Sequence, residues 1–111
     1  MGPNDLSLVA KHVMKLLVEQ RFEELEEATG GKRLSADDMA AAMADVGVAL
    51  VMPPENVWRE LRVTPVRNWP GAYNVKLDLW TARGRTSSSV ELTIHDKNGR
   101  PVLEVDDIIV G

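Results

Sequence analysis

The feature that most constrains the fold is a change in the spacing of apolar residues near Arg59. Before it, apolar residues recur every three or four positions, which is the spacing of amphipathic helices. After it, apolar and polar residues alternate, which is the spacing of half-buried strands. Helices followed by strands are typical of α+β proteins. We therefore expect helices over about 5–47 and a sheet over about 59–110, within one domain spanning 1–111.

Glycine and capping residues divide the helical half. The apolar stripe that begins near residue 5 continues past Gln20-Arg21, either as one bent helix or as two helices that meet there. Gly30-Gly31 ends this segment, because glycine readily adopts the conformation of a helix C-cap. Ser35 is the expected N-cap of the next helix, since an acidic residue follows three positions later, and Gly47 is its expected C-cap.

Four alternating segments follow, and they predict an antiparallel meander with the helices packed on one of its faces. Pro65 in the first segment indicates an edge strand or a bulge, because proline lacks an N–H for the sheet ladder. Turns are expected at 68–71, 83–86 and 96–99. The four segments are Leu61–Val66, Tyr73–Ala82, Ser88–His95 and Val102–Val110.

The apolar residues also predict how the last three strands pair. Two-residue loops at Gly84-Arg85 and at Asn98-Gly99 bring the apolar positions of these strands onto one continuous face. A slip by one residue would expose that face, so the hydrophobic pattern supports this register. The predicted pairs are Leu79 with Val90, Leu77 with Leu92, Val75 with Ile94, Ile94 with Leu103 and Leu92 with Val105.

This register places one carboxylate, that of Asp107, opposite Val90 on the apolar face. A carboxylate that is ionised, unpaired and fully buried is strongly destabilising. One interpretation is therefore a pocket acid or base with a raised pKa. The interpretation that we favour is that Asp107 lies near the end of the sheet and reaches solvent or an arginine such as Arg83 or Arg85.

Three further carboxylates, those of Asp78, Glu91 and Asp106, are predicted to form a row across the opposite face. Like charges that lie directly opposite one another destabilise a sheet. Such a row could serve as a divalent-cation site or as an electrostatic surface for a basic partner. We favour a solvated face with Lys76 and Arg62 interleaved, because water screens exposed charges.

Three tryptophans accompany only one tyrosine and one phenylalanine. Tryptophan is enriched in ligand pockets and at the centres of interfaces. We expect Trp58 to fill the core where helices meet the sheet, whereas Trp80 falls on the polar face and is a candidate interface residue. Trp69, Tyr73 and Arg85 complete the candidate ligand pocket or interface.

Composition excludes several classes of function. The absence of cysteine excludes thiolate nucleophiles and thiolate metal sites, and we expect no metal or cofactor. A formal net charge of −4 with 5% aromatic residues lacks the basic footprint of a nucleic-acid-binding domain. The longest apolar run, Val46–Pro54, is too short to cross a membrane, and the N-terminus shows no signal-peptide pattern. We therefore expect a cytoplasmic protein without nucleic-acid or membrane partners.

Two resemblances extend these expectations. The helical half, with its Arg21-Phe22-Glu23-Glu24-Leu25 linker and the capped segment 33–47, resembles the N-terminal part of small bacterial domains of the NTF2-like (cystatin-like) superfamily. That resemblance implies a bent sheet wrapped around helices, with a cavity between them.

The last 35 or so residues resemble an uncharacterised bacterial family with Leu-Trp-Thr, Gly-Arg-Ser, Glu-Leu-Thr and Asp-Asp-Ile elements. Thr86 replaces the serine of that pattern, and Ser87 replaces its next acidic residue. The resemblance supports the sheet, points to Arg85, Asp106 and Asp107, and implies no activity. The corresponding elements here are Leu79-Trp80-Thr81, Gly84-Arg85-Thr86, Glu91-Leu92-Thr93 and Asp106-Asp107-Ile108.

Two classes of function fit these observations. The first, which we favour, is a non-catalytic binding or protein-interaction domain, such as an immunity or accessory protein of a bacterial toxin system. It would hold a small ligand in the cavity, or it would bind a protein partner, such as a second copy of itself, through the sheet face that bears Trp80. The second, which the NTF2-like resemblance allows, is a small cavity enzyme (an isomerase, cyclase or epoxide hydrolase). Asp107 would then be the general base, with Tyr73, Trp69 or Arg85 as hydrogen-bond donors.

Overall fold

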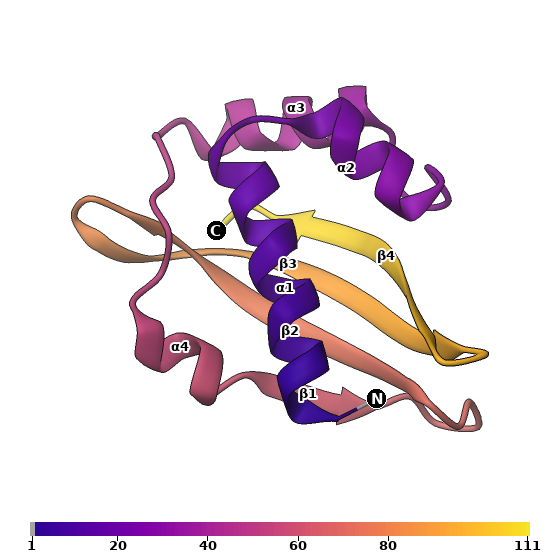
Figure 1. The fold of residues 1–111 in the computed structure, drawn as a ribbon. Helices are drawn as coiled ribbons and strands as arrows, with labels where there is room; N and C mark the ends of the chain where they lie inside the picture. The colour runs from indigo at the N-terminus through magenta and orange to yellow at the C-terminus, as the bar shows by residue number, and fades with distance from the viewer. Residues whose placement is uncertain (1) are drawn as a thin grey trace.

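Helices precede strands along the chain, as the change in apolar spacing predicts (Figure 1). The computed structural model describes residues 2–111, and this part of the chain forms four helices and one four-stranded antiparallel sheet. The helices are α1 (Pro3–Val18), α2 (Phe22–Thr29), α3 (Ala36–Val46) and α4 (Glu55–Arg59). The strands are β1 (Arg62–Pro65), β2 (Ala72–Thr81), β3 (Gly84–Lys97) and β4 (Arg100–Ile109).

The helix boundaries follow the capping residues. Gln20 adopts a φ of 58°, and this left-handed residue separates α1 from α2, so the segment is two helices rather than one bent helix. Gly30 and Gly47 cap α2 and α3 with φ values of 71° and 75°. At the start of α3, Ser35 Oγ accepts a hydrogen bond from the Asp38 N–H at 3.1 Å, and the Asp38 carboxylate accepts one from the Ser35 N–H at 3.0 Å. These reciprocal bonds form the predicted capping box.

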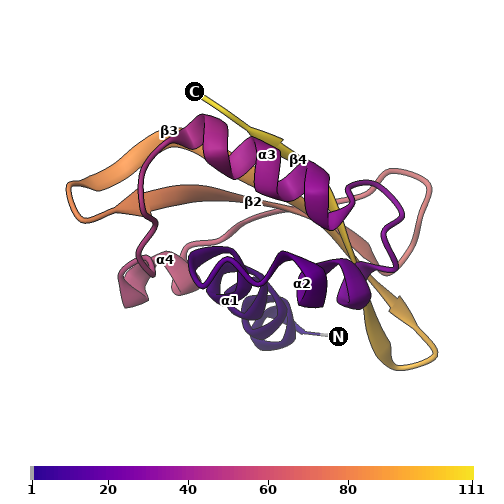
Figure 2. The same ribbon diagram turned by 90° about the horizontal axis from the view of Figure 1, so that it is seen from above.

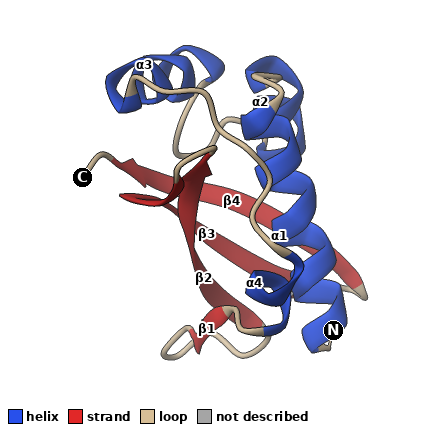
Figure 3. Cartoon of the chain, turned by 90° about the vertical axis from the view of Figure 1, so that its left-hand side faces the viewer, coloured by secondary structure: helices blue, strands red, loops and turns tan. Residues whose placement is uncertain are grey.

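The strands pair in chain order, β1-β2-β3-β4, which confirms the meander. Figure 3 shows α1 standing against one side of the sheet, while α2 and α3 lie at its β4 end. The view from above in Figure 2 shows the same layering. Pro65 ends β1, which is an edge strand of only four residues. One face of the sheet therefore carries α1, while α2 and α3 cover the sheet at its β4 margin.

The core lies between α1 and that face of the sheet. Val13, Met14 and Leu17 of α1 are almost completely buried, as are the inward residues of the strands. Trp58 of α4 belongs to the same cluster, as expected for a residue that fills the junction of helices and sheet. The inward residues of β2 to β4 are Val75, Leu77, Leu79, Val90, Leu92, Ile94, Leu103, Val105 and Ile108.

The pairing of β2 with β3 differs from the predicted register by two residues. The loop is Ala82-Arg83 rather than Gly84-Arg85, and the bulge between Asp78 and Trp80 takes back half of the resulting shift. Leu77 instead of Leu79 therefore lies opposite Val90. Gly84 follows the turn with a φ of 116°, a conformation that glycine adopts without steric cost. A two-residue shift keeps every side chain on its predicted face, so the apolar face of β2 forms as expected.

The pairing of β3 with β4 keeps the predicted register from the hairpin turn to Leu92 and then shifts at a bulge between Glu91 and Leu92. The extra residue in β4 sets Ile108, rather than Asp107, opposite Val90. Ile108 is buried, whereas Asp107 is exposed. The prediction that Asp107 lies on the apolar face is therefore wrong, and its carboxylate reaches solvent.

Candidate interaction surface

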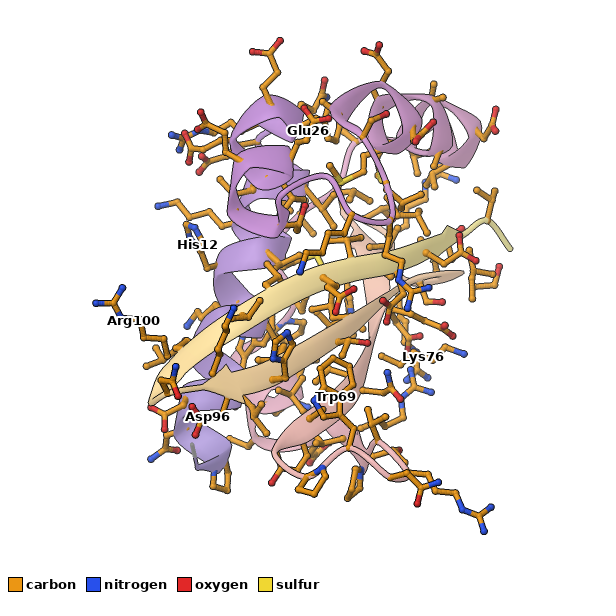
Figure 4. The ribbon with its side chains drawn as sticks, turned by 90° about the vertical axis from the view of Figure 1, so that its right-hand side faces the viewer. His12, Glu26, Trp69, Lys76, Asp96 and Arg100 are labelled. Atoms are coloured by element: carbon orange, nitrogen blue, oxygen red, sulfur yellow. The ribbon has the colours of Figure 1, made fainter. Side chains whose placement is uncertain are left out.

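The side of the sheet that faces away from α1, which we call the open face, carries most of the residues singled out from the sequence. Lys76 projects from this side in Figure 4, on the side of the sheet opposite to His12 of α1. Polar and charged residues dominate the open face because strand side chains alternate between faces. Its residues are Arg62, Asn74, Lys76, Asp78, Trp80, Ser89, Glu91, Thr93, His95, Glu104, Asp106, Asp107 and Ile109.

Four charged residues lie side by side across all four strands. Arg62 of β1 pairs with Lys76 of β2, Lys76 pairs with Glu91 of β3, and Glu91 pairs with Asp107 of β4. We call this set the charge row. Its two basic residues occupy the β1–β2 half of the open face, and its two acidic residues occupy the β3–β4 half.

The charge row replaces the row of carboxylates expected from the sequence. Asp78 lies opposite Ser89 rather than Glu91, and Glu91 lies between Lys76 and Asp107. Within residues 2–111, no group of three histidines or carboxylates has the geometry of a metal site. The hypothesis of a divalent-cation site in that row therefore has no geometric support. Lys76 and Arg62 share the face with the carboxylates, but within the charge row they lie together on one half of it rather than interleaved.

A pocket of about 230 Å³ opens at the edge of β2, beyond the point where β1 starts. We call it the edge pocket. Within it, Asp78 forms an ion pair with Arg62 at 2.9 Å and lies 3.9 Å from Arg85. A bulge between Asp78 and Trp80 shifts the pairing of β2 there. The pocket is lined by Val57, Glu60, Leu61, Arg62, Lys76, Leu77, Asp78, Trp80 and Arg85.

A hydrogen-bonded network occupies the β3–β4 half of the open face. Thr93 Oγ1 donates to Asp106 Oδ2 at 2.6 Å and accepts a hydrogen bond from Asn74 Nδ2 at 3.0 Å. Arg33, from the loop between α2 and α3, places its Nε 3.5 Å from Glu104 Oε1 and 3.7 Å from Asp106 Oδ1. Thr93 and Glu104 are buried within this network. One arginine therefore faces two carboxylates, and this half of the face keeps an excess of negative charge.

Aromatic residues lie towards both ends of the open face. The rings of Trp69 and His95 contact each other with their centroids 4.6 Å apart, and Trp69 remains 41% exposed. Trp80 lines the edge pocket near the other end of β2. Tyr73 does not join them, because it packs beside the core and lines a separate hollow next to α1 and Trp58.

The structure brings together three of the predicted site residues, Asp78, Trp80 and Arg85, in one pocket. Glu91, Asp106, Asp107 and Trp69 lie on or beside the same face but outside that pocket, and Tyr73 lies apart. Sequence reasoning missed the network residues Asn74, Thr93, Glu104 and Arg33. Alternation places the first three on the polar face, but no pattern in the sequence indicates that a loop arginine folds onto β4.

A larger hollow of about 880 Å³ lies between α2 and the start of α3. Its lining is mainly acidic, and its arginine, Arg21, already pairs with Glu19 and Glu24. These two carboxylates raise the pKa of the Arg21 guanidinium above its ordinary value. This hollow therefore presents an exposed acidic surface to solvent.

None of the helices within residues 2–111 has the length and apolar character needed to cross a membrane. No curated protein and no solved structure matches the chain significantly. The resemblance to NTF2-like domains stays a prediction. A family model described as "Domain of unknown function (DUF7668)" matches residues 14–111, and the chain belongs to that family.

Proposed function

We propose that this chain is a non-catalytic protein-interaction domain that binds an acidic segment of a protein partner through the edge pocket on its open face. The observation that supports this proposal is that three cationic side chains, against two carboxylates, line the edge pocket, and two of them, Arg62 and Arg85, flank Asp78. The pocket therefore carries an excess of positive charge, although the formal net charge of the chain is −4.

The charges of the pocket leave donors for a ligand. Arg62 donates one hydrogen bond to Asp78, whereas Arg85 lies too far from Asp78 to form a hydrogen bond with it. A guanidinium carries five donors, and it binds carboxylates with well-defined geometry. Three cations against the carboxylates of Asp78 and Glu60 leave the pocket with an excess positive charge.

The apolar lining of the pocket favours a protein ligand over a free ion. Trp80, Leu61 and Val57 line the same opening as the cations. Tryptophan and arginine together are the residues most enriched at the centres of protein interfaces. An acidic side chain next to an apolar one would therefore satisfy both parts of the pocket.

The alternative function, a cavity enzyme with Asp107 as general base, depends on Asp107 lying among apolar side chains. The bulge in β4 places this residue on the open face, where it is exposed. General bases with shifted pKa values are typical of enclosed sites. The geometry thus favours binding over catalysis as the proposal.

A peptide titration tests the proposed function. We would follow the indole N–H of Trp80 and the amides of Lys76 and Asp78 by heteronuclear NMR while adding a hexaglutamate peptide at low salt. Saturable shifts at these three positions are expected, and a hexalysine peptide should cause none there. The proposal fails if the hexaglutamate peptide leaves the pocket signals unchanged.

A matched pair of variants makes the titration specific. Arg85→Gln removes a pocket cation, whereas Arg83→Gln removes the same charge from the adjacent exposed turn. Exposed ion pairs contribute about 0.2–1 kcal/mol, so Arg85→Gln should weaken binding by roughly 1.4- to 5-fold. Equal weakening in both variants would indicate a general charge effect and would contradict binding in the pocket.

A further inference from the structure

We infer that the acidic partner of the open face is a second copy of this chain, held by a two-fold axis that runs parallel to the strands between β2 and β3. This inference rests on the proposed function, because it assigns the partner of the same face. Its basis is the order of charges in the charge row, which reads basic, basic, acidic, acidic from β1 to β4.

That order is self-complementary under the two-fold operation. Turning a second copy over about an axis parallel to the strands places its β4 above β1 and its β3 above β2. Arg62 then faces Asp107 of the second copy, and Lys76 faces Glu91 of the second copy. Each contact occurs twice, as in any isologous interface, so four attractive pairs form from one row.

The same two-fold operation also covers the edge pocket with a residue of the second copy. One step along the sheet from the charge row, Asp78 pairs with Ser89 and Ser89 pairs with Ile109. β1 begins at Arg62 and supplies no residue beside Asp78, which is where the edge pocket opens. The two-fold axis therefore brings Ile109 of the second copy, which is 37% exposed, over the pocket.

The area of the open face sets the expected affinity of the dimer. The strands β1 to β4 have 4, 10, 14 and 10 residues. At about 3.3 Å per residue and about 4.8 Å between strands, they project to roughly 600 Å². A standard specific complex buries about 800 Å² per partner. We therefore expect a dimer that forms at micromolar concentrations and dissociates on dilution or on addition of salt.

A charge-swap experiment tests the geometry. Arg62→Glu makes the β1 position acidic, and Asp107→Lys makes the β4 position basic. Either variant alone places like charges opposite each other in both copies of the contact between positions 62 and 107. The dissociation constant of each single variant should therefore be at least about tenfold higher than that of the wild type. An equimolar mixture of the two variants restores opposite charges in both contacts, and it should form a heterodimer.

The control is Arg100→Glu, which makes the same charge change at the β3–β4 hairpin tip, where Arg100 projects away from the open face (Figure 4). Sedimentation velocity over a concentration series measures association, and circular dichroism checks that each variant is folded. The inference is supported if the wild type and Arg100→Glu associate equally, if Arg62→Glu and Asp107→Lys each lose association, and if the mixture of these two variants regains it.

Three results would overturn it. The first is a wild-type chain that stays monomeric at high concentration and low salt. The second is a wild-type dimer that neither variant weakens, and the third is a mixture of the two variants that fails to associate. The hexaglutamate titration, carried out on the Asp107→Lys variant to keep the chain monomeric, separates the two proposals. Saturable binding there would retain the acidic-segment function even if self-association failed.

Discussion

Ile108 and Asp107 should respond in opposite ways to truncation, because the bulge in β4 exchanges their faces. Ile108 is 6% exposed and packs with Val90 in the core, whereas Asp107 is exposed. Ile108→Ala removes about three carbons at about 0.8 kcal/mol each, or about 2.4 kcal/mol before any cavity term. Buried Ile→Ala changes cost about 2–5 kcal/mol, so we expect a loss of about 2–4 kcal/mol in the free energy of unfolding.

Asp107→Ala should change the free energy of unfolding by less than about 0.5 kcal/mol, as is usual for exposed positions. Urea unfolding followed by tryptophan fluorescence measures all variants, and dilute protein keeps self-association out of the result. Ile109→Ala is the matched control, because it makes the same chemical change at a residue that is 37% exposed. Its cost should stay below about 1 kcal/mol.

The refuting result is specific to the register. Without the bulge, Asp107 would point into the core and Ile108 would point outward. Asp107→Ala would then stabilise the protein by more than about 1 kcal/mol, since it would remove a buried carboxylate, and Ile108→Ala would cost little. That pattern would show that β4 pairs regularly with β3 along its whole length.

Four further measurements test local features. Gly99→Ala should cost about 1–2 kcal/mol in urea unfolding although open space surrounds the position, because its φ of 81° is unfavourable for alanine. Ser35→Ala should cost about 1 kcal/mol through loss of the α3 cap. The Ser35 N–H holds the pKa of Asp38 below its usual value. The wild type should therefore be more stable than Asp38→Asn at neutral pH, and this difference in the free energy of unfolding should shrink as pH falls through the lowered pKa. A difference that does not depend on pH would contradict this. Thr93→Val should cost about 1–3 kcal/mol, and a double-mutant cycle with Asp106→Ala should show coupling through the 2.6 Å hydrogen bond; strictly additive losses would contradict this.

The broad architecture could be predicted because local signals and burial agree. The apolar spacing separates helices from strands. Gly30 and Gly47 mark helix ends through left-handed backbone conformations that few other residues favour, and Ser35 marks a helix start through its side-chain cap. The turn at Asn98-Gly99 has positive φ at both residues, which Asn-Gly strongly favours, so the β3–β4 hairpin begins in the predicted register.

The details of the sheet could not be predicted because the alternation of apolar and polar residues fixes the face of each side chain but not its partner on the next strand. A shift of two residues leaves Leu77 and Leu79 on the same face, so the apolar pattern accepts either partner for Val90. The bulge in β4 changes parity within one strand, and its only signal is that Ile108 fits the core better than Asp107. The assignment of Asp107 failed for that reason.

The candidate site was predicted in part for the same reasons. Alternation correctly grouped Asp78, Trp80 and Glu91 on one face, since their parity survives the two-residue shift. The alignment of Arg62 with Asp107 across four strands depends on the bulge and could not be foreseen. Arg33 reaches the face through tertiary packing of a loop, which leaves no periodic trace in the sequence.

The margins of the sheet decide how far self-recognition could extend. On one side, β1 has only four residues and ends in a proline, which offers no N–H to an incoming strand. On the other side, α2 and α3 contact β4 and flank it (Figure 1). Addition of further strands is therefore obstructed at both edges of the sheet. An assembly through the open face stops at two copies, because each copy has one such face. A molecule built this way can cluster in pairs at high concentration without seeding an open-ended fibre.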